Sequence, residues 1–230
     1  MSPRSGPRTV GHRGASALAP ENTLLAVERA IEHGLDLVEV DVRLSRDGEL
    51  VVVHDGEVPV NGVASPVASL VAAELARLPL GLGQGVPRLG EVLALARGRI
   101  GVYVELKGPR TGAALGRLMA SGGAVGVEVI SGSFEPSLVD ELRAAAPAVP
   151  RSVLFRPTET AAMLATCAAV GATYAHPCFR PLTPAIVDAL HAAGLLVMAP
   201  HTNDPEEARA FAGLGIDVLA SDDPRVLRPP

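Results

Sequence analysis

The chain has 230 residues, a formal net charge of −5, 48% hydrophobic residues and only 3% aromatic ones. The length fits one large α/β domain or two small ones, and scattered basic residues on an acidic chain exclude the usual nucleic-acid footprint. No apolar run approaches the roughly 20 residues that span a bilayer, and no signal segment opens the sequence, so we expect a cytoplasmic protein without stable membrane insertion.

Short apolar runs alternate with amphipathic stretches along most of the chain, which is typical of repeated βα units. The amphipathic stretches often open on Thr, Asp or Pro and close on Gly, as helices do. Cys167 and Cys178 fit no metal or disulfide spacing and are predicted to be free thiols. The candidate strands, in chain order, are 9–11, 37–42, 50–53, 101–106, 127–130, 152–155, 173–175, 195–199 and 217–220.

One connection breaks this alternation. The segment "LSRDG" between the second and third runs is too short for the crossover that parallel strands need, and Asp47-Gly48 is a hairpin signal. If the third run folds back, the other runs suffice for a closed parallel barrel. We therefore predict an α/β fold, a single-domain (β/α)8 TIM barrel over residues 1–230, with an extra hairpin arm after strand 2. An open doubly wound sheet is the alternative, but no Gly-rich dinucleotide loop supports it.

Chargeable side chains gather where the predicted strands end, which is where barrels of this kind place their active sites. His12 and Arg13 follow the first strand. In the second strand, Glu39 and Asp41 are two residues apart, so both face the barrel interior. Buried carboxylates repel each other unless a positive charge lies between them, and a divalent cation commonly supplies it.

The strand "VYVELKG" adds Glu105 and Lys107 in the same alternation. A structural ion pair between them is the alternative to a functional role. Three carboxylates from neighbouring strands form a hard oxygen site that suits Mg²⁺ or Ca²⁺ better than zinc.

A second histidine comes from the hairpin. Counting outward from Asp47-Gly48, His54 mirrors Asp41 and is expected to lie beside the carboxylates. Such a cluster suits an anionic substrate, with the histidines exchanging a proton near neutral pH. His176 and His201 also fall at strand ends, where pocket-lining and solvated positions are equally open, and receive no role.

The stretch "GHRGASALAPENTLLAVERAIEHGLDLVEVDVRLSRDGELVVVHD" closely resembles the glycerophosphodiester phosphodiesterase family. The resemblance continues through "VPRLGEVLAL", "VELK", "SF", "ND" and "SDDP", over nearly the whole chain. It implies a metal-dependent barrel enzyme that cleaves small-molecule glycerophosphodiesters to glycerol 3-phosphate and an alcohol. In that family the substrate's own glycerol hydroxyl can attack first, giving a cyclic phosphate that water opens.

Residue by residue, the resemblance implies three sets of roles. The acid and base pair matches His12 and His54. The phosphate contacts match Arg13 and Lys107. The ligands of a divalent cation, Mg²⁺ or Ca²⁺, match Glu39, Asp41 and Glu105. The oligomeric state is left open.

Departures from the family pattern leave the alcohol undetermined. Where the family commonly has W-T-V-N, this chain has "PHTN", with Pro200 in place of the Trp and His201 in place of the Thr, and it contains no Trp at all. The stretch after His54 is shortened and lacks the Arg-Thr-Thr that the family often carries.

Other readings of the site stay open. One is a phospholipase-D-like barrel acting on lysophospholipids or sphingolipids, and another is a non-catalytic binding barrel. An amidohydrolase-like enzyme would need an H-x-H pair on the first strand, where this chain has "HRG". "PENT" predicts a helix start, with Glu21 supporting the site, while Asp222 and Asp223 are expected to close the barrel or cap the last turn.

Overall fold

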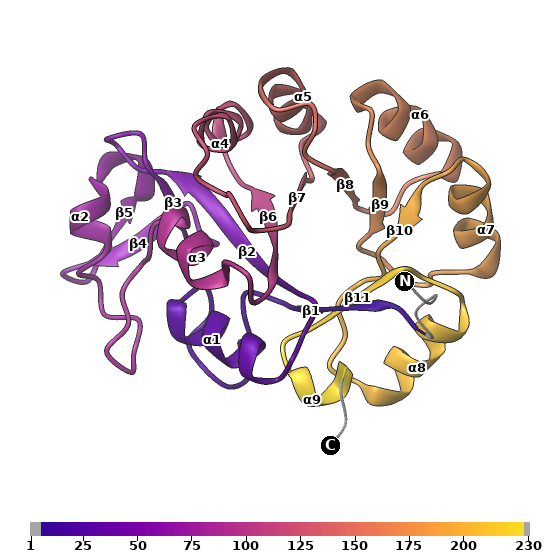
Figure 1. Cartoon of the computed structure of the whole chain (residues 1–230), viewed down its shortest axis with the longest axis horizontal. Helices are drawn as coiled ribbons and strands as arrows, with labels where there is room; N and C mark the ends of the chain where they lie inside the picture. Colours follow the sequence, from indigo (N-terminus) through magenta and orange to yellow (C-terminus); the bar gives the residue numbers. More distant parts are fainter. Residues whose placement is uncertain (1–5, 228–230) are drawn as a thin grey trace.

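The computed structural model describes residues 6–227, which form a ring of parallel strands surrounded by helices (Figure 1). Neighbouring strands follow the order β10-β9-β8-β7-β6-β2-β1-β11, and a parallel bridge between Met198 and Val218 joins the two ends. The predicted closed barrel is therefore confirmed. Its strands are β1 (Arg8–Gly11), β2 (Leu37–Leu44), β6 (Gly101–Leu106), β7 (Val129–Ser133), β8 (Arg151–Phe155), β9 (Tyr174–Pro177), β10 (Leu196–Val197) and β11 (Val218–Ser221).

Helices cover the outside of the barrel, and their ends follow the sequence signals. The hydroxyl of Thr23 accepts the N–H of Ala26 at the start of α1, and Thr183 and Asp204 cap α7 and α8 in the same manner. Within the described residues, no helix is long and apolar enough to cross a membrane. The helices are α1 (Leu24–Glu32), α3 (Leu89–Ala96), α4 (Thr111–Ala120), α5 (Pro136–Ala145), α6 (Thr160–Val170), α7 (Pro184–Ala192), α8 (Pro205–Gly213) and α9 (Pro224–Leu227).

Two layers of apolar side chains hold the barrel together. Outward-facing residues of the strands pack against the helices, whereas the inward-facing ones form a separate cluster that includes Leu37, Tyr103 and Ile130. Tyr103 is the largest fully buried side chain. A Cβ at Gly132 would lie 2.2 Å from the Tyr103 hydroxyl, so only glycine leaves room for this phenol.

The strand β7 (Val129–Ser133) begins later than the apolar run 127–130 and extends three residues beyond it. The extension was missed because this second half is polar. Ser131 and Ser133 are buried there, and their hydroxyls donate hydrogen bonds to the carbonyls of Val104 and Leu106 on β6. Hydroxyls that are paired in this way cost little to bury, so the strand continues through them.

The predicted hairpin arm is present, with a corrected register. Strand β3 (Leu50–Val52) runs antiparallel to β2, and the N–H of Val53 donates to the carbonyl of Asp41. Val53 rather than His54 therefore lies opposite Asp41. The cause is a three-residue loop over 46–48, with Gly48 at φ +82, instead of a two-residue turn.

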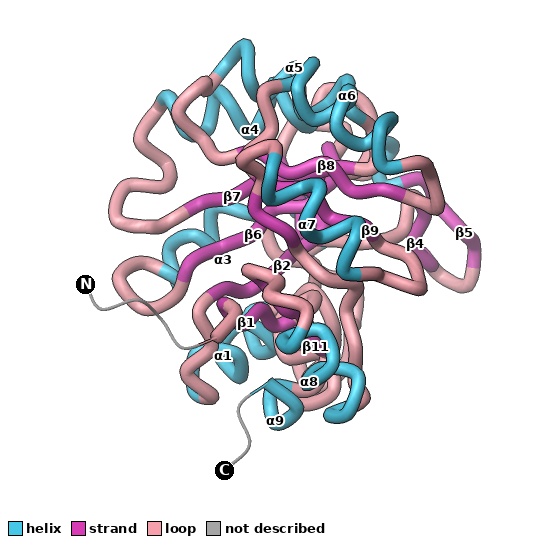
Figure 2. Tube along the Cα trace, turned by 90° about the vertical axis from the view of Figure 1, so that its right-hand side faces the viewer, coloured by secondary structure: helices cyan, strands magenta, loops and turns pink. Residues whose placement is uncertain are grey.

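The sequence analysis missed a second hairpin, which forms the stretch after His54. Strands β4 (Glu57–Val60) and β5 (Val63–Pro66) pair around Asn61-Gly62, both of which have positive φ as a type I′ turn requires. The 3-10 helix η1 (Val67–Ser69) and α2 (Ala72–Leu75) complete this lobe over a small apolar cluster. Figure 2 shows β4 and β5 at one end of the barrel, apart from the surrounding helices.

Candidate active site

Three buried carboxylates face the barrel interior at the carboxyl ends of β2 and β6. Glu39 and Asp41 share the inward face of β2 with Leu37, and Glu105 lies beside Asp41 in the parallel register. The three offer oxygen atoms that all lie within 4.8 Å of one another. The pattern read from the sequence and the folded chain thus place the same acidic groups together.

The electrostatics of this carboxylate cluster favour a bound cation. Burial raises the pKa of Glu39 to about 8, and the negative charge of Asp41 adds to the shift. Burial also raises the pKa of Glu105. Among the residues that the structure describes, Glu39 Oε1 is buried and finds no hydrogen-bond partner. An all-oxygen cluster with an unpaired oxygen fits a hard divalent ion such as Mg²⁺ or Ca²⁺.

Two cationic side chains border the cluster. Lys107 Nζ lies 2.7 Å from Glu105 Oε1 and 3.2 Å from Asp41 Oδ1. Burial alone would lower the pKa of Lys107, but the two carboxylates outweigh it and raise the value. Arg13 Nε lies 3.4 Å from Asp41 Oδ2 without making a hydrogen bond, and its Nη1 donates to both oxygens of Glu21.

The segment from Arg13 to Asn22 reaches the cluster through its backbone and one amide. The N–H of Arg13 donates to Glu39 Oε2 at 2.7 Å. Asn22, at φ +58, donates from Nδ2 to Asp41 Oδ2 and accepts the N–H of Asp41. Asn22 is a supporting residue that sequence reasoning had treated as part of a helix start, although the helix is capped by Thr23.

His12 is held at the edge of the cluster with one ring nitrogen on each side. Its Nδ1 lies 2.7 Å from Asp222 Oδ1, and its Nε2 lies 4.0 Å from Glu39 Oε2. Burial alone would lower the pKa of His12, but the hydrogen bond to Asp222 and the charge of Glu39 outweigh it and raise the value. With the Nδ1 proton directed at Asp222, Nε2 carries the lone pair that faces the site.

Asp222 has a different position from the one expected from the sequence. Instead of closing the barrel or capping a turn, its carboxylate accepts hydrogen bonds from Ser16 Oγ and Asn203 Nδ2 and contacts His12. The hydrogen bond with His12 holds the pKa of Asp222 well below its usual range. The expectation holds only for Asp223, whose carboxylate accepts the backbone N–H of Arg225 at the start of the last helix.

Two further histidines surround His12. The ring of His201 stacks on the ring of His12, with centroids 4.4 Å apart and planes inclined by 16°. His176 Nε2 donates to the carbonyl of Ala199, and burial lowers the pKa of His176 to about 4, so it is neutral at physiological pH. The residue that replaces the family Thr thus packs directly on His12.

His54 lies on the hairpin arm rather than inside the cluster. Its side chain is 35% exposed, and its Nδ1 lies 2.8 Å from the carboxylate of Asp55. Arg43 Nε donates to the His54 carbonyl and fixes the backbone there. Six of the seven predicted site residues therefore converge, while His54 follows the arm strand β3, next to Val53, whose N–H donates to the Asp41 carbonyl.

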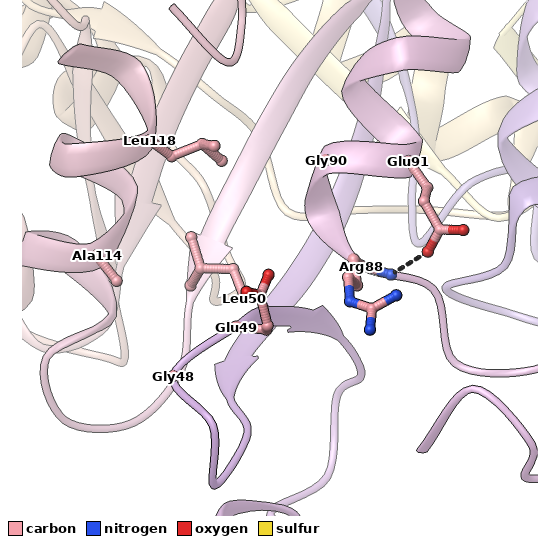
Figure 3. Close-up of a pocket in the computed structure, with 8 residues that line it drawn as sticks. All are labelled: Gly48, Glu49, Leu50, Arg88, Gly90, Glu91, Ala114 and Leu118. Carbon is pink, nitrogen blue, oxygen red and sulfur yellow. Dashed lines mark hydrogen bonds between the residues drawn. The ribbon is translucent and has the colours of Figure 1, made fainter. Parts of the chain in front are cut away.

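A hollow on the outside of the barrel offers no comparable chemistry. It lies between the β2–β3 hairpin, the start of α3 and α4 (Figure 3). Arg88 and Glu91 line it, but the Glu91 carboxylate accepts the Arg88 N–H at 2.8 Å and serves as a helix cap. Neither histidine nor a group of converging carboxylates lines this hollow.

Comparison with known proteins agrees with the architecture. The model of the glycerophosphoryl diester phosphodiesterase family matches residues 12–226. A probable glycerophosphodiester phosphodiesterase of Mycobacterium tuberculosis (strain CDC 1551 / Oshkosh) is 30% identical over 95% of this chain and 90% of its own length. A putative one of Bacillus subtilis (strain 168) is 29% identical over 94% of both chains.

Solved structures show the same fold. An Oleispira antarctica phosphodiesterase in complex with the product sn-glycerol-3-phosphate superposes with a TM-score of 0.87 at 25% identity, covering 96% of this chain and 94% of that one. A putative glycerophosphodiester phosphodiesterase from Galdieria sulphuraria gives 0.86 at 27% identity, covering 97% and 98%.

Proposed function

This chain belongs to the glycerophosphoryl diester phosphodiesterase family, and on that basis we propose that it hydrolyses glycerophosphodiesters to glycerol 3-phosphate and an alcohol in a metal-dependent reaction. The observation that carries the proposal is the position of His12 Nε2 beside three buried carboxylates, with Nδ1 anchored by Asp222. A general base beside a carboxylate cluster that can hold a divalent cation is what metal-dependent phosphodiester cleavage requires.

We propose that Glu39, Asp41 and Glu105 hold the divalent cation, Mg²⁺ or Ca²⁺. The unpaired Glu39 Oε1 and the raised pKa of Glu39 support this assignment, because a bound cation offsets both. When bound, such an ion offsets negative charge on the phosphoryl oxygens.

Arg13 and Lys107 are assigned to the phosphate. Lys107 Nζ already lies between two carboxylates, and the buried Nε of Arg13 has no hydrogen-bond partner in the described range 6–227. A phosphoryl oxygen at this position would complete the hydrogen bonding of Arg13.

In the proposed reaction, His12 Nε2 removes the proton from a glycerol hydroxyl, whose oxygen then attacks phosphorus. The bond from phosphorus to the alcohol oxygen breaks, and the ring of His54 gives its proton to that oxygen. Water then opens the cyclic phosphate, with the two histidines exchanging roles. Asp222 stabilises the imidazolium that forms on His12, and Asn203 holds Asp222 through a 2.7 Å hydrogen bond.

The experiment is to measure the release of glycerol 3-phosphate from glycerophosphocholine, glycerophosphoethanolamine and glycerophosphoglycerol, first with EDTA and then with added Mg²⁺ or Ca²⁺. We expect release that EDTA abolishes and metal restores. Intact diesters under every condition would refute the proposal and leave the phospholipase-D-like and binding-protein readings. The cytoplasmic location stays a prediction from the sequence.

A further inference from the structure

A hollow of about 160 Å³ adjoins the carboxylate cluster on the side of the hairpin arm. Every charged side chain that lines it is cationic, although the chain as a whole has a formal net charge of −5. We call it the basic pocket, and its charged residues are Arg43, Arg46, Lys107 and Arg110. Because Lys107 also contacts Asp41 and Glu105, the pocket begins where the scissile phosphate is expected to bind.

Arg43 presents an open guanidinium to the basic pocket. Its Nε donates to the His54 carbonyl, while Nη1 and Nη2 have no hydrogen-bond partner within residues 6–227. Gly56 and Gly108 both lie beside this guanidinium, and a Cβ at each of them would be 3.5 Å from Nη1. Two positions without side chains therefore leave room for a ligand beside this guanidinium.

Arg110 stands at the rim of the same pocket. It is exposed, has φ +65, and its side chain makes no hydrogen bond or ion pair in the described part of the chain. It directly precedes α4, whose N-terminal end adds positive potential. Arg46 differs, because its guanidinium already contacts the Ser69 carbonyl and Glu74.

We propose that the basic pocket binds a second anionic group, a phosphate or a carboxylate, carried by the alcohol half of the diester. This inference rests on the proposed function. The glycerol half has no charge beyond the diester phosphate, so only the alcohol half can bring another anion. Arginine guanidinium groups bind both phosphate and carboxylate well. Within residues 6–227, the side chain of Arg110 and the two Nη atoms of Arg43 have no hydrogen-bond partner.

The other side of the site disfavours a cationic alcohol. Recognition of a quaternary ammonium needs an open aromatic face. The chain has no Trp, and Phe134, which directly follows β7, already has the Arg156 guanidinium 4.6 Å from its ring centroid. An alcohol such as choline therefore lacks its usual partner at this ring, whereas an anionic alcohol finds one in the basic pocket.

The test compares three diesters of glycerol 3-phosphate whose alcohols differ mainly in charge: glycerol, glycerate, and glycerol bearing a phosphate monoester. We expect kcat/KM to rise with the charge of the alcohol, by about tenfold or more from the neutral to the phosphorylated one. This rise in kcat/KM should come mainly from a lower KM, and the difference between the diesters should become smaller at high salt. The glycerate and phosphate arms show which anion the pocket prefers.

Arg110→Asn is the variant of choice, because Asn tolerates a positive φ and the Arg110 side chain makes no hydrogen bond or ion pair within residues 6–227, while the backbone bond from Ala114 to its carbonyl is kept. In this variant the ratio of kcat/KM for the charged diesters to kcat/KM for the neutral one should fall by about tenfold. The neutral diester should be cleaved at the wild-type rate. Arg117→Gln is the matched control. It removes the same charge from the exposed side of the same helix, about 10 Å further along, and should leave the preference unchanged.

Equal kcat/KM for the three diesters in the wild type would overturn the inference, as would equal losses in Arg110→Asn and Arg117→Gln. If the enzyme cleaved all three without preference, only the pocket assignment would fail. If it cleaved none of them with Mg²⁺ or Ca²⁺, the proposed function would fail together with it.

Discussion

Replacement of Asp222 by Asn should remove the charged partner of His12 and leave the carboxylate cluster unchanged. The Asp222 carboxylate lies 2.7 Å from His12 Nδ1, and both side chains are less than a third exposed. A hydrogen bond to a charged group at such a site contributes about 1.5–3 kcal/mol. If that contribution stabilises the imidazolium formed in the transition state, its loss lowers kcat/KM by about 10- to 150-fold.

The pH dependence has a definite sign. The hydrogen bond to Asp222 and nearby carboxylate charge raise the pKa of His12 above its ordinary value. His12 acts as a base only when neutral, so the wild-type activity falls as the pH drops through that raised pKa. Without the Asp222 charge the pKa falls, and the acid limb of the pH profile of kcat/KM should move to lower pH.

Asp223→Asn is the natural control, because the neighbouring carboxylate pairs with Arg225 rather than with His12. The assay is kcat/KM between pH 5 and 9 for both variants, with circular dichroism to verify the fold. Wild-type activity and an unmoved acid limb in Asp222→Asn would refute the role given to this carboxylate.

Three further predictions concern the surroundings of the site. His201→Ala should lower kcat about 2- to 10-fold because the stacked ring is lost, whereas His201→Phe should keep kcat near wild type; equal losses would contradict a stacking role. Glu207→Gln should lower the free energy of unfolding by about 1 kcal/mol at pH 7, since its partner Arg180 is half exposed. The hydrogen bonds from Arg180 lower the pKa of Glu207 to about 2, so this difference should shrink in denaturant titrations as the pH falls from 4.5 towards 2, and a constant difference would argue against the ion pair. Asn22→Gly keeps the positive φ but removes the amide that bonds Asp41, and should cost about 1–3 kcal/mol in a urea titration; an unchanged midpoint would contradict this.

The barrel was predictable because its signals are local. Alternation of apolar runs with capped helices identified the strands, and the short "LSRDG" connection identified the antiparallel arm. One of the two errors has a physical cause. The polar half of β7 was missed because buried hydroxyls of Ser131 and Ser133 are satisfied only by the neighbouring strand. The β4–β5 hairpin was missed although Asn61-Gly62 marks its turn.

The position of a site residue was predictable where alternation along its strand determines whether the side chain faces the barrel interior, as for Glu39, Asp41 and Glu105. It was not predictable where residues meet across the barrel. Asp222 directly follows the last strand and His12 directly follows the first, and nothing local in the sequence indicates their 2.7 Å contact. The stacking of His201 on His12 likewise depends on how the ends of β1 and β10 lie in three dimensions.

The most direct test of the central claim is the release of glycerol 3-phosphate as a function of Mg²⁺ and Ca²⁺ concentration, for the wild type, Glu105→Gln and Glu128→Gln. Glu105 is one of the three converging carboxylates, whereas Glu128 is half exposed, directly precedes β7 and pairs with Arg8 at the start of β1, at the opposite end of these strands from the site. We predict metal-dependent release by the wild type and Glu128→Gln, and a large loss of activity with weakened metal response in Glu105→Gln. The account would be contradicted if EDTA left the release of glycerol 3-phosphate unchanged. It would also be contradicted if Glu105→Gln responded to metal as the wild type does.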